Sequence, residues 1–270
     1  MTAVTQMWSY RNLIYNLAQR ELRSRYKKSF LGWLWSLINP ASTLVIYSLA
    51  FGVILKQSPP EPAANGTTDT YALYLFAGLY IWNFFNATVT GSIVALQASG
   101  PLLNKVYFPP SCPAIANTAT VLLQAFIESG ILAAIMLLLG NLGTSVLLFP
   151  LLIVMLTLFS LGIGLVLSVY NVYYRDVGYL VGIGLNLMFY ATPIIYPISA
   201  VPKEAWGLPL QDIVRLNPIA QMVEWSRDIF WHDTWPSTAS LLGVIGVSLV
   251  VFVGGLALFN HKSRLIAEEL

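Results

Sequence analysis

The sequence predicts an all-α membrane protein with six transmembrane helices. Hydrophobic residues make up 57% of its 270 residues and charged residues only 10%, whereas soluble domains are about 25% charged. A basic N-terminal segment runs directly into an uncharged stretch long enough to cross a bilayer, LGWLWSLINPASTLVIYSLAFGVIL. Further apolar windows of similar length follow along the chain. Together these observations exclude an ordinary soluble domain.

Windows of about 20 apolar residues place the six spans near 34–55, 72–96, 114–139, 146–170, 178–197 and 238–259. Prolines 40, 150 and 193 fall inside or near the ends of these spans, where neighbouring helices can satisfy the freed carbonyls. No linker or low-complexity tract divides the chain. We therefore expect one domain, 1–270, made of a cytoplasmic segment 1–33, a six-span bundle 34–259 and a cytoplasmic tail 260–270.

The distribution of cations predicts the orientation. With both termini in the cytoplasm, the inner segments hold ten Lys and Arg residues and the outer segments hold four. Such an excess marks the cytoplasmic side of a membrane protein. Six spans also give the even number of crossings that this arrangement needs. The sequence thus predicts a multi-pass protein with both ends inside.

The first 33 residues carry six cations and one anion, Glu21. Apolar residues recur at helical spacing on one face, and polar residues occupy the other, which is typical of a helix lying in the membrane interface. Two interpretations stay open: a simple topology anchor, or an interfacial helix that also packs against a cytoplasmic partner. The cations are Arg11, Arg20, Arg23, Arg25, Lys27 and Lys28.

Two further cytoplasmic segments follow. Residues 97–113 are bounded by prolines and carry Gly100, Pro101 and the apolar pair Leu102 and Leu103, followed by Asn104 and Lys105. They form either a short helix that docks on a soluble subunit or an ordinary connection between spans. The third segment places Arg175 beside Asp176 at the end of a span, where a local charge pair together with positive-inside anchoring would account for both residues.

The outer segment 198–237 is the longest connection and is not simply polar. Asn217 and Pro218 form a good helix start, with Asn as the cap and Pro in the first turn. Apolar residues then recur at helical spacing, and four tryptophans indicate headgroup depth. We expect surface-lying or re-entrant helices that cap the outer mouth, with Trp225 and Arg227 as gate candidates; a small cap without a gating role is the alternative.

Enzyme chemistry finds little support in this chain. Two histidines and one cysteine are too few for a nitrogen- and sulfur-rich metal site, and the phosphate-binding pattern G-x-x-x-x-G-K-[ST] is absent. We expect no catalytic residue, no metal and no cofactor in this chain. The one clear carboxylate inside a span is Glu128, with Gln124 one turn before it; either it serves transport or it satisfies an interhelical hydrogen bond.

Aromatic side chains are abundant in three of the spans. Most such rings pack against lipid or protein, but the C–H faces of sugar rings also stack well on aromatic surfaces. An aromatic passage would let a glycan slide without strong binding at one site. The candidates for lining a channel, besides Glu128, are Trp33, Tyr47, Phe51, Tyr80, Trp82, Phe85, Phe189 and Tyr190.

Four separated motifs carry a resemblance to a known family. They are RELRSRYKKSFLGWLWSLINP, YYRDV, ATPIIYPIS and RLNPIAQMVEWSRDIF, and they occur in the family's order over nearly the whole chain. The sequence resembles the membrane subunits of ABC-2 type polysaccharide exporters, the permeases for O-antigen, teichoic acid, capsule and related lipid-linked glycans. The motifs do not identify one glycan.

The resemblance implies a function and a set of partners. Such permeases pair with a second copy of themselves and bind two separate ATP-binding subunits, which hold the ATP and magnesium. In a bacterial inner membrane, they export polysaccharide linked to a polyprenyl diphosphate; no nucleic acid takes part. The resemblance assigns ATPase coupling to Arg11, Arg20, residues 100–105, Arg175 and Asp176. It also makes Arg23, Arg25, Lys27 and Lys28, with Arg20, candidates for receiving the diphosphate, or for binding lipid headgroups alone.

Two other functions stay open at this point. An ABC-2 exporter of a drug or simple lipid would share the architecture but not the cargo. An ion-coupled carrier without an ATPase would need more intramembrane charged groups than this sequence offers.

Overall fold

The computed structural model describes residues 10–27, 29–103, 105–106, 108–205 and 207–263. Within these ranges the chain is built of helices, and the strand-like pairing is a single bridge between Ala205 and Leu208. Five helical segments are long and apolar enough to cross a membrane, and one further apolar helix is shorter. The predicted all-α, multi-span class is confirmed, while six crossings remain a prediction.

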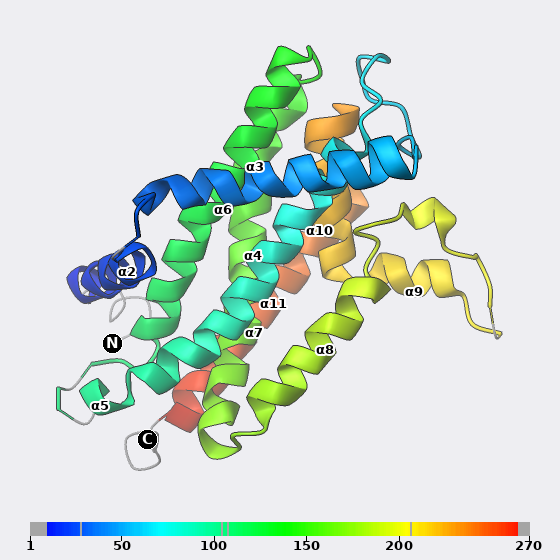
Figure 1. Cartoon of the computed structure of the whole chain (residues 1–270). Coiled ribbons are helices and arrows are strands. Elements are labelled where there is room, and N and C mark those ends of the chain that lie inside the picture. Colours follow the sequence, from blue (N-terminus) through cyan, green and yellow to red (C-terminus); the bar gives the residue numbers. More distant parts are fainter. Residues whose placement is uncertain (1–9, 28, 104, 107, 206, 264–270) are drawn as a thin grey trace.

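Helix α2, Arg11–Tyr26, is the predicted amphipathic helix, and it packs beside the start of α6. The first apolar segment, Gly32–Ile54, follows as a 3-10 turn η1 (Gly32–Leu34), helix α3 (Trp35–Tyr47) and a π-helical turn η2 (Ser48–Ile54). Figure 1 shows α3 lying across the long helices rather than alongside them, in contact with α4 and α6. Little of this segment is buried within the chain.

Four long helices form the bundle: α4 (Tyr71–Ala98), α6 (Cys112–Leu138), α7 (Phe149–Tyr173) and α11 (Thr238–Lys262), with the 3-10 turn η3 (Thr144–Leu148) before α7. Helix α4 is the central element, because it packs against both α6 and α7 and is the most deeply buried of the long helices. Helix α11 packs on the other side of α7. There, a Cβ added at Gly162 would lie 2.6 Å from the Val251 carbonyl oxygen, so the glycine lets the two backbones approach closely.

Helix α8, Val177–Ala191, is shorter than the predicted span 178–197. It ends at Thr192, which adopts an extended conformation with ψ 137°, because the following Pro193 disfavours helical geometry in the residue before it. Fifteen residues at 1.5 Å each reach roughly 22 Å, less than the ~30 Å of a bilayer core. The helix alone therefore does not span the hydrocarbon.

The outer connection contains the expected helical pair, α9 (Leu210–Leu216) and α10 (Pro218–Arg227), after the 3-10 turn η4 (Ile198–Ala200) and before the π-helical turn η5 (Asp228–His232). The predicted cap is confirmed: the Asn217 side-chain oxygen accepts a hydrogen bond from the Ile219 N–H at 3.0 Å. Helix α10 is largely buried and packs against α4, whereas α9 has no buried residue.

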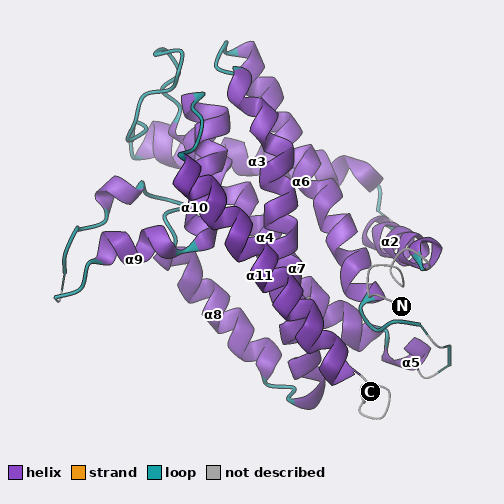
Figure 2. Ribbon diagram, turned by 180° about the vertical axis from the view of Figure 1, so that it is seen from behind, coloured by secondary structure: helices purple, strands orange, loops and turns teal. Residues whose placement is uncertain are grey.

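The two ends of the bundle differ in what they carry. The short helix α5 (Gly100–Leu103), the α7–α8 turn and the end of α11 lie together at one end in both views (Figures 1 and 2). The loop after η2 and the α6–α7 turn lie at the opposite end. The predicted orientation makes the first end cytoplasmic.

Candidate functional site

A polar face runs along α4 through the level of the membrane. It consists of Asn83, Asn86, Thr90 and Gln97, which recur at helical spacing on a helix otherwise packed into the bundle. Asn83 and Gln97 are exposed, and the other two are half-buried. Polar side chains within a span face protein or a water-filled cavity rather than lipid. We therefore expect this polar face to meet protein or water rather than lipid.

Glu128 of α6 lies beside the upper part of the polar face. It lines a pocket of about 180 Å³ together with Tyr80, Asn83 and Gln124. Gln124 Nε2 donates to Glu128 Oε1 at 3.1 Å, and Asn83 of α4 lines the same pocket. Gln124 and Glu128 lie one turn apart on α6, so this hydrogen bond is intrahelical, and the two interpretations of Glu128 stay predictions.

Gln124 also donates to a carbonyl group of α3 that lacks its helical partner. Pro40 has no N–H, so the carbonyl of Ser36, four residues earlier, lacks its usual helical partner. Gln124 Nε2 donates to this carbonyl at 3.3 Å. The same amide thus connects α6 to α3 while it contacts Glu128, which makes the cluster a joint among three helices.

A second pocket continues the polar face toward the end of the bundle that carries the α7–α8 turn. It measures about 400 Å³ and lies where α4 meets the α7–α8 turn, with Thr90 and Gln97 on one side and Arg175 on the other. The Asn171 side-chain oxygen accepts a hydrogen bond from the Gly178 N–H at 2.7 Å, which fixes the start of α8. Arg175 and Asp176 are both exposed at this turn.

Helix α2, the short helix α5 and the start of α6 form one packed unit. Leu17 of α2 is buried against Phe108 and Cys112, and Leu102 and Leu103 pack onto the same cluster. These two leucines were predicted to dock a partner, but they are half-buried inside the protomer and Gly100 is buried. Pro101 and Lys105 are exposed, and Asn104 lies outside the described residues.

The predicted basic cluster follows the exposed side of α2. Arg11, Arg20 and Arg23 are exposed on the helix, and Lys27 is exposed just after its end. Arg25 belongs to the last turns of α2, and Lys28 lies outside the described residues. The structure thus brings several of these cations onto one helix beside α6.

The aromatic candidates fall into two groups. Tyr80, Trp82, Phe85 and Trp225 are buried in the protomer core, where Trp82 packs against Phe85 and Phe189 with centroids 5.6 Å apart in each pair. They pack the interior here, and of the four, Tyr80 and Trp225 also border pockets, Tyr80 that beside Glu128. Trp33 and Tyr190 are 53% and 70% exposed, so these two rings remain on the outside of the single chain.

Arg227, a predicted gate residue, is fully buried at the outer end. Its Nη1 donates to the Pro193 carbonyl at 3.0 Å and to Glu224 Oε1 at 2.7 Å, and its Nη2 donates to the Ile194 carbonyl at 2.7 Å. The guanidinium also lies 4.1 Å from the centroid of the Tyr74 ring. Arg227 therefore joins α10, α4 and the segment after α8; it does not line a passage in this structure.

A row of aromatic rings joins α3 to the outer helices. Tyr47 contacts Phe51 at 5.9 Å between centroids, and Phe51 contacts Tyr71 of α4 at 4.9 Å. Tyr71 contacts Tyr74 at 6.2 Å, and Tyr74 contacts Trp231 of η5 at 5.7 Å. Two of the predicted channel residues, Tyr47 and Phe51, thus belong to this aromatic row, which runs from the end of α3 to η5.

The polar face of α4 is the part of the site that the sequence interpretation missed. Its signal was present as Asn, Asn, Thr and Gln at positions 83, 86, 90 and 97 of an apolar span. The sequence prediction named aromatic residues of the same span as channel candidates instead. Among the described residues, no group of three or more His, Cys, Asp or Glu side chains lies close enough together to hold a metal ion.

These features define a multi-span membrane protein with a polar surface along its central helix, which is the arrangement of a membrane transport component. The family model described as "ABC-2 type transporter" matches residues 12–231. The chain belongs to the ABC-2 type transporter family, and the resemblance carried by the four motifs is confirmed.

Curated relatives match over nearly the full length. The O-antigen export system permease protein RfbA of Myxococcus xanthus is 29% identical over 268 residues, covering 99% of this chain and 98% of its own length. A protein of the same name from Klebsiella pneumoniae is 28% identical over 263 residues, covering 96% and 95%. The polysialic acid transport protein KpsM of Escherichia coli is 27% identical over 250 residues, covering 91% of both chains.

Proposed function

We propose that this chain is the membrane subunit of an ATP-driven exporter that moves a polyprenyl-diphosphate-linked polysaccharide from the cytoplasm to the outer face of the bacterial inner membrane. Two copies form the conduit, and two separate ATP-binding subunits supply the energy. The named relatives are an O-antigen export permease and a polysialic acid transport protein. Their alignment over nearly the whole chain supports a polysaccharide as the cargo here as well.

The polar face of α4 is the observation that supports a hydrated conduit. Amide and hydroxyl groups exchange hydrogen bonds with sugar hydroxyls, and a polymer can pass from one such group to the next without a strong single site. The two flanking pockets extend this surface toward Glu128 and toward Arg175. We place the sugar chain along this face, with α8 and a second copy enclosing it.

The cytoplasmic unit of α2, α5 and the start of α6 is our proposed contact for the ATP-binding subunits. Because Leu102 and Leu103 pack inward, we assign the direct contact to the exposed side of α2 and to Pro101 and Lys105. Closure of the ATP-binding subunits would push on this unit and shift the helices joined to it. ATP drives this change only by binding the two states differently.

Replacing polar groups on α4 tests the conduit. We expect Asn86→Leu and Thr90→Val together to slow ATP-dependent export about tenfold, because each lost hydrogen-bonding group is worth roughly 0.5–1.5 kcal/mol. The measurement is the transport of lipid-linked polysaccharide in vesicles that contain the chain and its ATP-binding subunit. Copurification of the two subunits checks that the complex still assembles.

Thr157→Val in α7 is the matched control. Thr157 and Thr90 both donate to the carbonyl four residues earlier in their own helix, each at 2.7 Å. Thr157 is outside the polar face and both flanking pockets, so export should be unchanged. If Thr157→Val slowed export as much as the combined Asn86→Leu and Thr90→Val variant, the assignment of the polar face would be wrong. Uphill transport by the chain alone under an ion gradient would refute the need for an ATP-binding partner.

A further inference from the structure

A pocket of about 250 Å³ lies beneath the interfacial helix, between α2, α4 and α6. Its volume is well above the roughly 10–15 Å³ that a single water needs. Leu17, Val94, Ala98 and Ala116 give it apolar walls, while Arg20, Glu21 and Asn117 supply polar groups. A pocket with both kinds of lining, under a helix of the membrane interface, fits an amphipathic ligand.

Asn117 contributes a buried amide to the lining of this pocket. The residue is 6% exposed, and its Nδ2 has no hydrogen-bond partner among the described groups. Its amide lies directly over Gly91 of α4, so a side chain at position 91 would displace it. A buried N–H without an acceptor is costly, and the oxygen of a bound ligand would satisfy it.

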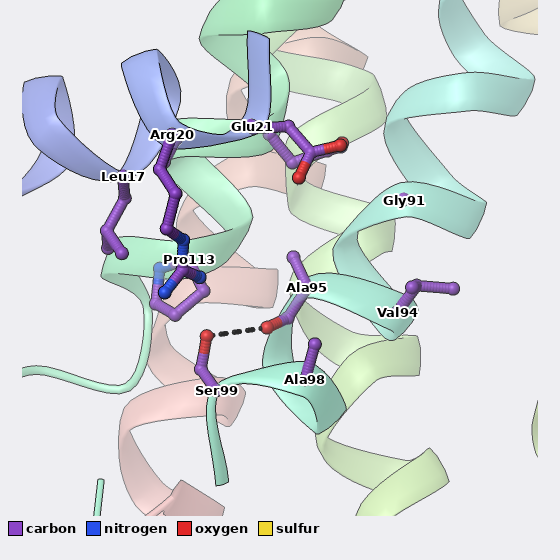
Figure 3. A pocket seen from close by; sticks show the side chains of 11 residues that line it. Leu17, Arg20, Glu21, Gly91, Val94, Ala95, Ala98, Ser99 and Pro113 are labelled. Carbon is purple, nitrogen blue, oxygen red and sulfur yellow. Dashed lines mark hydrogen bonds between the residues drawn. The ribbon is translucent and has the colours of Figure 1, made fainter. Parts of the chain in front are cut away.

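The pocket carries opposite charges at two separate places. Figure 3 shows Arg20 descending from α2 toward Pro113, while the neighbouring Glu21 carboxylate reaches toward α4. Glu21 has another interaction within the chain, and its two carboxylate oxygens can accept several donors at once. The site therefore presents a cation, an anion and an amide donor around one hollow.

We propose that this pocket binds the headgroup of a zwitterionic phospholipid that carries a phosphate and a primary ammonium, as in phosphatidylethanolamine. The phosphate oxygens accept from the Arg20 guanidinium and from Asn117 Nδ2. The ammonium donates to Glu21, and the glycerol end of the lipid lies along the apolar wall near Val94. The bound lipid then fills the space between the interfacial helix and the two spans.

The charges argue against a diphosphate as the occupant. A diphosphate has no cationic group for Glu21, and its negative charge would meet the carboxylate at short range. A net-neutral headgroup matches one Arg and one Glu, because each charge of the ligand meets its opposite. The Glu21 carboxylate thus distinguishes the bilayer lipid, whose ammonium it attracts, from the diphosphate of the cargo, which it repels.

Native mass spectrometry of the purified full-length chain in detergent provides the test. The chain is offered phosphatidylethanolamine, phosphatidylglycerol, phosphatidylcholine or a polyprenyl diphosphate, and bound lipid is counted. We expect phosphatidylethanolamine to bind about tenfold more tightly than phosphatidylglycerol. Phosphatidylcholine should bind less well too, because its quaternary ammonium cannot donate hydrogen bonds to Glu21.

Charge variants identify the contacts. Arg20→Gln should weaken binding of both phosphatidylethanolamine and phosphatidylglycerol about tenfold, whereas Glu21→Gln should weaken only the former and abolish the preference. Arg23→Gln is the matched control, since Arg23 is exposed on the same helix but does not line the pocket. Substitutions at these exposed or half-buried positions should leave the core intact. Asn117→Leu provides a further variant at a buried position of the pocket.

Three outcomes would overturn the proposal. Equal binding of phosphatidylethanolamine and phosphatidylglycerol would remove the role of the ammonium. Equal loss with Arg20→Gln and Arg23→Gln would reduce the effect to general surface charge. Tight binding of the polyprenyl diphosphate that displaces phosphatidylethanolamine and persists in Glu21→Gln would assign the pocket to the cargo. Because the assay uses neither ATP nor export, its result is independent of the proposed function.

Discussion

At the scale of single residues, Arg227 shows how a charge is held inside an apolar bundle. Its guanidinium meets two carbonyls that the chain frees after α8 ends, and a carboxylate three residues earlier on its own helix. Gly78 of α4 leaves the room for this arrangement, since a Cβ there would lie 3.4 Å from Nη2 and 2.9 Å from Val223 Cγ1. The two Nη groups, the carbonyls and the carboxylate satisfy one another, so the burial is tolerated, although the buried Nε has no hydrogen-bond partner among the described residues.

Removing this cation should destabilise the fold. We expect Arg227→Met to lower the free energy of unfolding by about 3–5 kcal/mol, because the carboxylate of Glu224 and two buried carbonyls lose their donor. Arg215→Met, at an exposed position of α9, should change it by less than about 0.5 kcal/mol. Unfolding in mixed detergent micelles measures both. A similar loss in the two variants would contradict the structural role of Arg227.

The same residue marks a limit of sequence interpretation. Asn217 could be predicted as a helix cap because capping depends on the local order of residues, and the structure confirms it. Arg227 was predicted as a gate candidate from its position near several tryptophans. The sequence around it does not indicate which carbonyl groups it contacts. Those partners lie 33 and 34 residues away along the chain, and only tertiary packing brings them together.

At the scale of helices, apolar length predicted positions well and boundaries less well. The span expected at 72–96 is Tyr71–Ala98, and the one expected at 114–139 is Cys112–Leu138. The fifth was predicted too long, because an apolar window does not register that Thr192 precedes a proline and ends the helix. The direction of α3 across the bundle could not be predicted, since periodicity describes a helix but not its crossing angle.

The contact between α7 and α11 gives a test at this scale. A Cβ at Gly255 would press on the backbone of Gly162, whereas one at the neighbouring Gly254 would meet nothing within 4 Å. We expect Gly255→Ala to destabilise the fold by about 1–3 kcal/mol, because the two helices must separate. Gly254→Ala should be neutral or stabilising by up to about 1 kcal/mol, since Ala favours helix.

Thermal unfolding of the two purified variants in the same detergent compares them directly. The glycines are adjacent in the same helix, so differences in helix propensity and expression cancel. If Gly255→Ala is as stable as Gly254→Ala, the close approach of α7 and α11 is not a source of stability.

At the scale of the whole molecule, the exposed side of α8 is one of the apolar surfaces that a single chain leaves uncovered. It carries Tyr179, Leu187 and Tyr190, which are 79%, 69% and 70% exposed, together with the exposed Asn186. The exposed side of α11 carries aliphatic residues such as Leu242 and Val250 and suits lipid. Tyrosines and an amide on α8, next to the polar face of α4, favour contact with a second copy.

Cysteine cross-linking tests this pairing. The native Cys112 is buried, so a Leu187→Cys variant presents one reactive thiol, and a short thiol cross-linker should convert it to a covalent dimer in membranes. Val250→Cys on α11 is the control and should stay monomeric. Cross-linking through Val250 and none through Leu187 would place the second copy on the other side of the bundle.

Parts of the candidate site that follow from local pattern could be predicted, whereas parts that follow from packing of the whole chain could not. The amphipathic α2 could be predicted because its pattern is local. The polar face was visible as spacing, but its exposure depends on which sides of α4 are covered by α6 and α7. The docking of Leu102 and Leu103 on a partner stays a prediction, and the pattern of so short a segment gave no sign that they pack on the buried cluster of Leu17, Phe108 and Cys112.

The aromatic row has a mechanical consequence. Its rings pack one against the next from Tyr47 to Trp231, and α3 follows the amphipathic helix α2 in the chain. The row therefore couples α3 to η5 within one polypeptide. We expect a tilt of α3 to shift η5 and the adjoining α10, so that a movement at one helix reaches the others without a further subunit.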